Sequence, residues 1–490
     1  MFSSPFHRIL TLVILLTITG SCASPTPPVL PFVSETEIPS TPALALQPPQ
    51  PPAVPQRTPH STKIPGGGQG QGEGSNASQN LNFDIPEHSL DVILGRPTDT
   101  SITLSLLSAT NQAINISYGA QAEPYQTISA SLLANKPQEI TLTDLIPNTE
   151  YIYRINGDEN TFHTARPPGA TFTFTIQADS HLDSNTNPQV YLQTLANQKS
   201  DNPDFVIDLG DTFMTDKYKP YTDAATQYLA QRYFLGQIGQ TAPLFLVLGN
   251  HDGEGAAKGS AGLETSLWSA QMRTKYFPNP APDVFYSGNP TAEQNFGLLH
   301  DYYAWTWGDA LFIILDPYWF TPPAKGNATD LWNPTLGSEQ YQWLKTTLET
   351  SQAKWKFVFI HQLPSGTDKN GRGGVEVAPY YEWGGHNPDG SYAFDEYRPG
   401  WGLPIHQLLV THQVTAVFHG HDHLFVKQEL DGIIYQEVPQ PGAARPNSTG
   451  SAAEYNYLTG DVLGSPGHIR VTVSPEEVTV EYVRSYLPQS

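Results

Sequence analysis

The sequence predicts an α/β (α+β) sandwich of mixed sheets flanked by helices, preceded by an all-β domain. Three observations support this fold class. Short runs of alternating polar and apolar residues fill residues 85–168, as expected for antiparallel strands. From about residue 170 onward, apolar runs of strand length alternate with stretches of helical composition. Five polar segments in this second part each follow one of the apolar runs directly.

Residues 1–22 are predicted to form a signal peptide. Arg8 precedes an apolar run, Ile9–Ile18, that is too short to span a bilayer comfortably. Small residues follow this run, and among them lies Cys22, the only cysteine in the chain. This order resembles a bacterial lipoprotein signal, in which Cys22 would be acylated and become the first mature residue. The alternative is an ordinary signal peptide that is cleaved near Ala23. We therefore expect a secreted protein or a membrane-anchored lipoprotein at the cell surface or in the periplasm.

The next two regions differ in composition. Residues 23–84 are rich in Pro, Gly, Gln and Ser and are predicted to be a disordered linker, because they bury too little apolar surface to become ordered. Residues 85–168 contain turn signals between seven short runs, which suits an antiparallel sandwich with a structural role. The seven runs are Ile93-Leu94, Ser101–Leu107, Ala113–Tyr118, Tyr125–Ala130, Gln138–Thr143, Glu150–Asn156 and Asn160–Thr164.

Residues 169–490 are predicted to form a second, larger domain. Helices are expected at Pro188–Lys199, at Asp223–Gly236 and after Ser338, which is a plausible N-cap. Two long segments, Gly253–Asp301 and Gly366–Gly400, are rich in Gly, Pro and aromatic residues. Loops of such length in a compact domain usually form functional walls or lids.

The five polar segments of this domain carry its chemistry. They are Asp179-Ser180-His181, Gly210-Asp211, Gly249-Asn250-His251-Asp252, His361 and Gly420-His421-Asp422-His423. The apolar runs before them are Thr171–Ala178, Phe205–Asp208, Leu244–Leu248, Lys356–Ile360 and Val414–Phe418. Because successive strand ends lie along one edge of a sheet, these segments would concentrate oxygen and nitrogen donors there. Carboxylate, amide and imidazole groups in this pattern predict two adjacent metal ions and a hydrolase that acts on phosphate esters.

The net charge of −22 bears on the expected partners. A nucleic-acid polymer is held by basic stripes, so none is expected as a partner of this acidic chain. A small phosphate ester is compatible with it, because a pair of metal ions makes the local potential positive. A membrane surface is expected as a partner only through a lipid anchor on Cys22.

In this order, the five segments resemble the motifs of the calcineurin-like metallophosphoesterase superfamily. Gly-Asn-His-Asp and Gly-His-x-His are its most specific pieces. The segment Leu145–Tyr153 resembles the corner of a fibronectin type III-like domain, in which a tyrosine packs back on the preceding turn. A domain of that kind in front is similar to the purple acid phosphatase and PhoD-like branches. The resemblance covers about Asp91 to Val483 and implies a metallophosphoesterase fold.

The resemblance also implies a role for each site residue. Asp179, His181 and His423 would hold one metal ion, Asn250, His361 and His421 would hold the second, and Asp211 would bridge the two. A bridging carboxylate offsets the repulsion between two cations about 3.5–4 Å apart and leaves room for a shared hydroxide, the expected nucleophile. His251 would protonate the leaving oxygen, and Asp252 would orient the ring of His251.

One position departs from the purple acid phosphatases. Those enzymes place a metal-binding tyrosine three residues after the bridging aspartate and have no histidine in the first motif. Here Met214 occupies that position, and His181 is present. Without a tyrosinate ligand, no visible charge-transfer band is expected. The donors suit Mn, Fe or Zn, and donor type alone does not choose among these metals.

The substrate wall is expected in the loop between His361 and His421. Arg372 would clamp a phosphate oxygen through its planar guanidinium. Tyr381 and Trp383 would stack on a base or a sugar of the substrate. The alternatives are that the two aromatic residues only pack the loop and that Arg372 is a solvated charge.

Three functions are weighed on this basis. The leading one is an exported dinuclear-metal phosphohydrolase that cleaves phosphomonoesters or phosphodiesters. The alternative is a catalytically inactive cell-surface binding or scaffold protein on the same fold, which has no need of the complete ligand set. A nuclease is disfavoured, because few basic residues lie near the site segments in the sequence.

Overall fold

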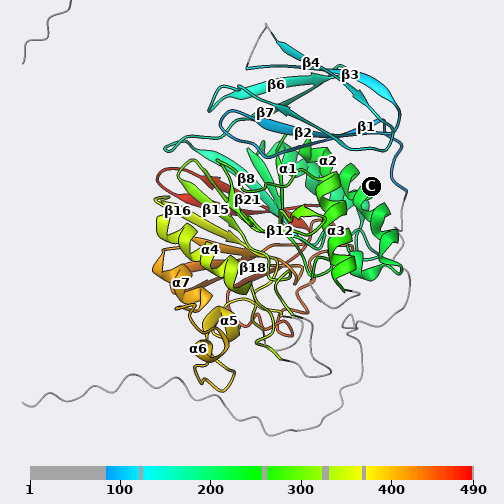
Figure 1. The fold of residues 1–490 in the computed structure, drawn as a ribbon. Helices are drawn as coiled ribbons and strands as arrows, with labels where there is room; N and C mark the ends of the chain where they lie inside the picture. The colour runs from blue at the N-terminus through cyan, green and yellow to red at the C-terminus, as the bar shows by residue number, and fades with distance from the viewer. Residues whose placement is uncertain (1–83, 121–124, 256–261, 323–329, 367–370, 488–490) are drawn as a thin grey trace, which may run out of the picture. The chain divides into compact units, whose positions relative to one another are not determined.

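The computed structural model describes residues 84–120, 125–255, 262–322, 330–366 and 371–487 (Figure 1). The predicted signal peptide with Cys22, and residues 23–83 of the predicted linker, lie outside these ranges. Within them, no helix is long and apolar enough to cross a bilayer.

Seven strands form two antiparallel sheets within residues 85–168, one strand for each predicted run. The first sheet has the order β1-β2-β5 and contains β1 (Leu90–Gly95), β2 (Ile102–Ser108) and β5 (Gln138–Leu142). The second has the order β4-β3-β6-β7 and contains β3 (Gln112–Gly119), β4 (Gln126–Leu132), β6 (Glu150–Ile155) and β7 (Asp158–His163). Residues from both sheets share one apolar cluster, so this region is a β-sandwich.

The predicted tyrosine corner has a clear counterpart in the sandwich. The backbone N–H of Ile146 donates a hydrogen bond of 2.8 Å to the phenolic oxygen of Tyr151, so the ring does pack back on the preceding turn. Tyr151 is buried, and its ring stacks on that of Phe162. The fibronectin type III-like assignment itself stays a prediction.

Two mixed sheets build the second domain. The five-stranded sheet has the order β10-β9-β8-β21-β22 and contains β8 (Phe172–Gln177), β9 (Phe205–Asp208), β10 (Leu244–Leu246), β21 (Gly467–Val473) and β22 (Val478–Arg484). The eight-stranded sheet has the order β11-β14-β15-β16-β17-β19-β18-β20. Its strands are β11 (Ser287–Gly288), β14 (Tyr303–Trp307), β15 (Ala310–Ile314), β16 (Trp355–Phe359), β17 (Ala416–His419), β18 (Leu424–Leu430), β19 (Ile433–Glu437) and β20 (Asp461–Gly464). A short hairpin, β12 (Ala292–Glu293) and β13 (Gly297–Leu298), stands apart from both.

The two sheets pack face to face through aromatic residues. Phe174 of β8 meets Phe312 of β15 edge-on, with their ring centroids 5.1 Å apart. Side chains alternate along each strand, so Phe357 and Phe359 of β16 enter this inter-sheet cluster while Val358 faces the helices on the other side. Central strands such as β9, β15 and β17 are therefore buried on both faces.

Helices cover the outer face of each sheet (Figure 1). On the five-stranded sheet these are α1 (Pro188–Ser200), α2 (Ala225–Gly239) and α3 (Gly262–Tyr276), with the short 3₁₀ helices η1 (Thr215–Lys217) and η2 (Tyr221–Ala224) before α2. On the eight-stranded sheet they are α4 (Gly337–Thr350), α5 (Tyr381–Gly384), α6 (Phe394–Tyr397) and α7 (Ile405–Thr411). The predicted sandwich of mixed sheets flanked by helices is therefore confirmed.

Two expectations about helices are wrong. The segment Gly253–Asp301 is not loop throughout, because it contains α3, a helix of 15 residues. Ser338 is not the N-cap of α4, since the cap residue is Leu336 and Ser338 lies inside the first turn. The N–H groups at this helix start find other acceptors, since Leu336 donates to the carboxylate of Glu382 and Gly337 to the hydroxyl of Thr335.

The sandwich and the second domain share a core. Ile93 of β1 and Leu107 of β2 belong to the same apolar cluster as Phe234 and Leu235 of α2. Figure 1 shows α2 against the sandwich at this point. The sandwich is thus packed against the helical layer that covers the site-bearing sheet.

Candidate metal centre

The predicted metal-binding side chains follow the carboxyl ends of parallel strands. Asp179 and Asp211 come just after the neighbouring strands β8 and β9, and Asn250 follows β10, the next strand of that sheet. His361 and His421 follow β16 and β17, which are parallel neighbours in the facing sheet. Because the two sheets pack face to face, these five loops meet at one end of the inter-sheet core.

The first group of ligand atoms consists of Asp179, His181 and His423, which lie within 4.8 Å of one another. The Nε2 atoms of His423 and His181 are 3.4 Å and 3.6 Å from Asp179 Oδ1. The rings of His181 and His423 stand edge to face. This is the set that the sequence predicts for the first metal ion.

The second group consists of Asp211, His361 and His421, again within 4.8 Å of one another. One oxygen of Asp211 joins the two groups. Its Oδ2 lies 3.3 Å from Nε2 of His361 and 3.6 Å from Nε2 of His181. Asp211 therefore occupies the position that a bridging carboxylate needs.

Unsatisfied buried atoms test whether these residues suit metal ions. In the described part of the chain, Asp179 Oδ1, His181 Nε2, His361 Nε2 and Asn250 Oδ1 are buried without a hydrogen-bond partner. Leaving such atoms unpaired is costly, and four of them at one place indicate a missing common partner. All four have lone pairs suited to a cation, and Asn250 is the seventh predicted ligand. The residues present therefore fit two metal ions.

Neighbouring acceptors fix the histidine rings. His361 Nδ1 lies 2.8 Å from the carbonyl oxygen of Leu209, so the ring donates there and Nε2 keeps its lone pair for a metal. His181 Nδ1 lies 3.4 Å from Asp183 Oδ2, which favours the same tautomer. Nearby, His419 Nδ1 lies 2.7 Å from a carboxylate oxygen of Glu437.

The backbone of the ligand loops is unusual. Five predicted ligands, Asp179, His181, Asp211, His421 and His423, have φ between 49° and 81°. Residues other than glycine pay about 1–3 kcal/mol each for such a conformation, which persists where function requires it. Gly249 is needed for a different reason, because a Cβ at this position would overlap the backbone nitrogen of Asp211. The Gly-Asp and Gly-Asn-His segments are thus pressed against each other.

Charge keeps the two carboxylates ionised. Burial, the largest influence, raises the pKa of Asp179, but the imidazoles of His423 and His361 outweigh it and hold that pKa well below its usual range. Asp211 behaves alike, with His361 and His251 outweighing burial to lower its pKa. In turn, burial lowers the pKa of His361, but Asp211 and Asp179 raise it to about 9, so a metal ion that binds at Nε2 would displace a proton. Both aspartates are therefore anionic, which is the form that binds cations.

His251 stands beside the ligand groups but belongs to neither. Its Nε2 lies 4.0 Å from Asp211 Oδ2, and its Nδ1 lies 2.9 Å from Asp216 Oδ2. Its backbone N–H donates to Asp211 Oδ1 at 2.7 Å. The ring is thus held by a carboxylate on one nitrogen and turned toward the centre with the other.

The expected role of Asp252 is wrong. Both of its oxygens are occupied by backbone N–H groups: Oδ1 accepts from Thr212 and Phe213, and Oδ2 accepts from Asp211 and Gly249. Asp252 therefore ties two ligand loops together and does not orient the ring of His251. That contact belongs to Asp216.

Arg372 lies beside the centre, as the sequence predicts. Its Nη1 donates to Asp422 Oδ1 at 2.7 Å and to the carbonyl oxygen of His421 at 3.3 Å. The guanidinium also lies 4.1 Å above the ring of Tyr455. Two ordered neighbours hold it next to a predicted ligand, so it is more than a solvated loop charge.

Tyr381 and Trp383 do not form a substrate wall. Trp383 is completely buried, and its Nε1 donates to the hydroxyl of Tyr435 at 2.8 Å. Tyr381 is 4% exposed and packs edge-on against Trp332. Both belong to the apolar cluster under the eight-stranded sheet, so neither ring is available for stacking on a substrate.

Two carboxylates near the centre were missed at the sequence level. Asp183 touches the ring of His181, and Asp216 touches the ring of His251. Each is close in sequence to a motif. Whether such an acidic residue contacts the histidine of the motif depends on the backbone turn between the two, which the sequence alone does not reveal.

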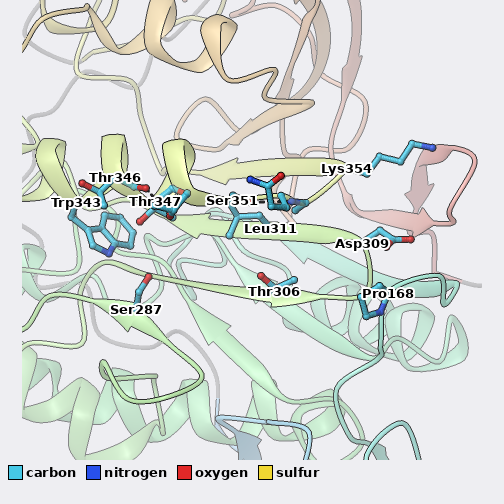
Figure 2. A pocket seen from close by; sticks show the side chains of 14 residues that line it. Pro168, Ser287, Thr306, Asp309, Leu311, Trp343, Thr346, Thr347, Ser351 and Lys354 are labelled. Atoms are coloured by element: carbon cyan, nitrogen blue, oxygen red, sulfur yellow. Dashed lines mark hydrogen bonds between the residues drawn. The ribbon is translucent and has the colours of Figure 1, made fainter. Parts of the chain in front are cut away.

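A cavity of about 470 Å³ adjoins the centre. It is lined in part by Asn250, Asp216, Tyr218, Lys219 and Tyr221. A larger cavity, about 690 Å³, lies elsewhere, between α4 and the strands β14 and β15 (Figure 2). No predicted site residue lines the larger one, so the smaller cavity is the one relevant to the centre.

Comparison with known proteins agrees with this geometry. The family model described as calcineurin-like phosphoesterase matches residues 172–425, which is just over half of the chain and includes all seven predicted ligands. No curated protein matches the chain.

Two solved structures share the fold. A structure described as PhoD is 14% identical, has a TM-score of 0.56, and its match covers 80% of this chain and 88% of its own. The purple acid phosphatase PPD1 from yellow lupin (Lupinus luteus) seeds is 18% identical, has a TM-score of 0.53, and its match covers 81% of this chain and 72% of its own. At these identities the likeness concerns the fold.

Proposed function

Since the chain belongs to the calcineurin-like phosphoesterase family, we propose that it is an exported dinuclear-metal phosphohydrolase that cleaves phosphomonoesters or phosphodiesters. Family membership supports the class, a metal-dependent phosphoric ester hydrolase. One observation carries the dinuclear part of the proposal. Oδ2 of Asp211 lies 3.3 Å and 3.6 Å from histidine nitrogens that belong to two different ligand groups.

The protein groups around the centre have separate tasks in this proposal. When bound, two metal ions would neutralise the phosphate and activate a water as nucleophile. His251 would donate the proton at Nε2 to the leaving oxygen, while Asp216 holds Nδ1. Arg372, fixed by Asp422 and Tyr455, would bind a phosphate oxygen that does not react.

The cavity of about 470 Å³ beside Asn250 and Asp216 is the proposed place for the organic arm of the ester. It lies on the side of Asp216, the residue that holds His251, and a leaving group must lie within reach of that acid. Its volume suits a small molecule, and the net charge of −22 disfavours a polymer of nucleotides.

Export is proposed from the anatomy of the N-terminus, with Cys22 as the acylated residue. Its test is independent of catalysis. The wild-type protein should partition with membranes and carry a lipid on its N-terminal peptide, whereas the Cys22→Ala variant should not. A soluble wild-type product that begins near Ala23 would point to an ordinary signal peptide.

The experiment that tests the function is an activity panel on metal-reconstituted protein. It compares p-nitrophenyl phosphate, bis-p-nitrophenyl phosphate and nucleotides, each with Mn, Fe or Zn. Hydrolysis of at least one ester is expected, and His251→Ala should reduce turnover by about 10²–10⁴-fold at unchanged metal content. Metal loss in that variant would make His251 a ligand or a structural prop. A protein with two bound ions and no activity would favour the inactive scaffold instead.

A further inference from the structure

One more parallel strand ends at the centre without supplying a predicted ligand. β15 runs parallel to β16 in register, with Ile314 opposite Phe359. The backbone N–H of Leu315 donates to the carbonyl oxygen of Phe359 at 2.9 Å, so the two segments stay paired just beyond the end of β15. His361 follows β16 directly, and the loop after β15 therefore lies beside it. This loop contains Tyr318.

The loop after β15 is rigid at Tyr318. The carboxylate of Asp316 accepts hydrogen bonds from the backbone N–H groups of Tyr318 at 2.7 Å and Trp319 at 3.3 Å. Asp316 is itself fixed by Gln340 of α4, which bonds its backbone N–H at 2.9 Å and its carbonyl oxygen at 2.7 Å. Asp316 and Gln340 are both fully buried. The hydrogen bonds of Asp316 and Gln340 together hold the backbone of Tyr318 in one conformation.

The phenol of Tyr318 lies close to the predicted metal-binding residues. Its ring centroid is 6.5 Å from that of His361, and only 9% of the residue is exposed. An ordinary tyrosine hydroxyl keeps its proton near neutral pH, so the phenol can act as a neutral hydrogen-bond donor.

The hydroxyl of Tyr318 has a weak partner. It donates to Gln362 Oε1 at 3.3 Å, which is longer than the usual O–H···O distance of about 2.7–2.8 Å. A phosphate oxygen is a charged and stronger acceptor, and hydrogen bonds to charged groups contribute roughly twice as much as neutral ones. If the Tyr318 hydroxyl donated to such an oxygen in place of Gln362, the lost hydrogen bond would cost little free energy.

From this placement we infer that Tyr318 is a further substrate-positioning residue, whose O–H donates a hydrogen bond to a non-reacting oxygen of the bound phosphate. The inference rests on the proposed function, because it supposes a phosphate held between the two ligand groups. The class of ligand it names is the phosphoryl group itself, common to monoesters and diesters.

The test is the variant Tyr318→Phe, which removes one oxygen atom and keeps the ring. Metal content, thermal midpoint, steady-state kinetics and the affinity for inorganic phosphate are measured on metal-loaded protein. We expect unchanged metal content and stability, and a loss of about 10–100-fold in kcat/KM, as for one hydrogen bond to a charged group. Phosphate affinity, measured by calorimetry, should fall about 5-fold or more by the same contact.

Tyr341→Phe is the matched control. Its hydroxyl donates to the carbonyl oxygen of Leu403 at 2.7 Å and accepts from the backbone N–H of Leu403 at 3.3 Å in the helical layer, so this variant also removes a hydrogen-bonded tyrosine hydroxyl. Kinetics and phosphate affinity should stay at the wild-type values in the control.

Two results would overturn the inference. Wild-type kinetics and phosphate affinity in Tyr318→Phe would mean that the hydroxyl does not touch the substrate. Loss of metal, or a visible absorption band in the wild-type protein that disappears in the variant, would make Tyr318 a metal ligand. Failure of the proposed function looks different, because the wild-type protein would then hydrolyse no phosphate ester at all.

Discussion

Single carboxylates around the centre have distinct tasks, set by what each oxygen touches. One oxygen of Asp211 accepts a hydrogen bond from the backbone N–H of His251, and the other lies close to histidines of both ligand groups. Both oxygens of Asp252 accept hydrogen bonds from backbone N–H groups. Asp216 is the only one of the three that contacts the ring of His251 at hydrogen-bond distance within the described residues. At the residue scale, position in a motif is therefore a weaker guide than hydrogen-bond partners.

The contrast between Asp216 and Asp252 can be measured directly. Asp216→Asn should lower kcat by about 10–100-fold, the usual effect of removing a carboxylate behind a functional histidine, at an unchanged thermal midpoint. Asp252→Asn should instead destabilise the protein by about 1–3 kcal/mol, because an amide places N–H groups against buried N–H groups. The measurements are steady-state kinetics and thermal unfolding. If Asp216→Asn kept wild-type kcat while Asp252→Asn lost activity at an unchanged thermal midpoint, Asp252 would be the residue that orients the ring of His251.

A buried ion pair anchors the loop that follows His251. Glu254 accepts two hydrogen bonds from Arg273 of α3, at 2.7 Å and 2.8 Å, and both side chains are almost completely buried. Arg273→Met leaves the carboxylate without its partner, so the free energy of unfolding in urea should fall by about 3–5 kcal/mol. Adding Glu254→Gln should recover part of the loss.

The exposed pair of Arg154 and Glu159 provides the control for this prediction. Their side chains are 37% and 50% exposed, and Arg154→Met should leave the free energy of unfolding close to the wild-type value. Equal losses from Arg273→Met and Arg154→Met would show that burial does not set the strength of the first pair.

Elements were predictable where their apolar pattern was regular. The seven sandwich strands and the five strands before the polar segments follow alternating or continuous apolar runs, and all are present. Helix α3 was not predicted, because its buried face is built from Ser266, Ser269, Ala270, Arg273 and Tyr276. These residues repeat with helical spacing but are mostly not apolar, so the helix is invisible to a hydrophobic pattern.

The substrate wall failed for a related reason. Tyr381 and Trp383 lie in a segment rich in Gly and aromatic residues, which is the composition of exposed binding loops and of tightly packed turns alike. Only the tertiary contacts of α5 reveal that both rings are buried. Order along the chain, in contrast, was informative for the ligands, because parallel strands must bring their carboxyl ends to the same edge.

Close contact between two ligand loops makes a prediction at the level of elements. Gly249→Ala should force the loop after β10 away from Asp211, costing about 1–3 kcal/mol of stability as overpacking does. Metal retention during dialysis against a chelator should fall in parallel. Gly236→Ala is the control, since the nearest atom to its Cβ would be 3.8 Å away, and it should leave both properties unchanged or raise stability. A Gly249→Ala protein with wild-type metal retention would contradict the close packing of these loops.

For the whole molecule, Arg232 links the sandwich to the catalytic domain. This arginine of α2 is fully buried and donates to the hydroxyl and the carbonyl oxygen of Ser105 in β2, both at 3.0 Å, and to the carbonyl oxygen of Tyr276. Burial lowers the pKa of Arg232 to about 10, against the opposing charge of Asp91. Together with the shared apolar cluster, these bonds predict that the two domains unfold as one unit.

Two spectroscopic probes can test this coupling. All 9 tryptophans lie in the second domain, whereas far-ultraviolet circular dichroism reports on both domains. In the wild-type protein the two unfolding curves should coincide. Arg232→Met should lower the midpoint and separate the curves, because the sandwich loses its polar anchor. Separate transitions in the wild-type protein would show that the domains are thermodynamically independent.

The most direct test of the central claim is the number of metal ions bound per chain. Elemental analysis of reconstituted and dialysed protein should give two ions in the wild type. Asp211→Ala, which removes the shared oxygen, should lose both, whereas His361→Ala should lose one. A wild-type protein that retains one ion or none, with all seven side chains intact, would contradict the account of a dinuclear centre.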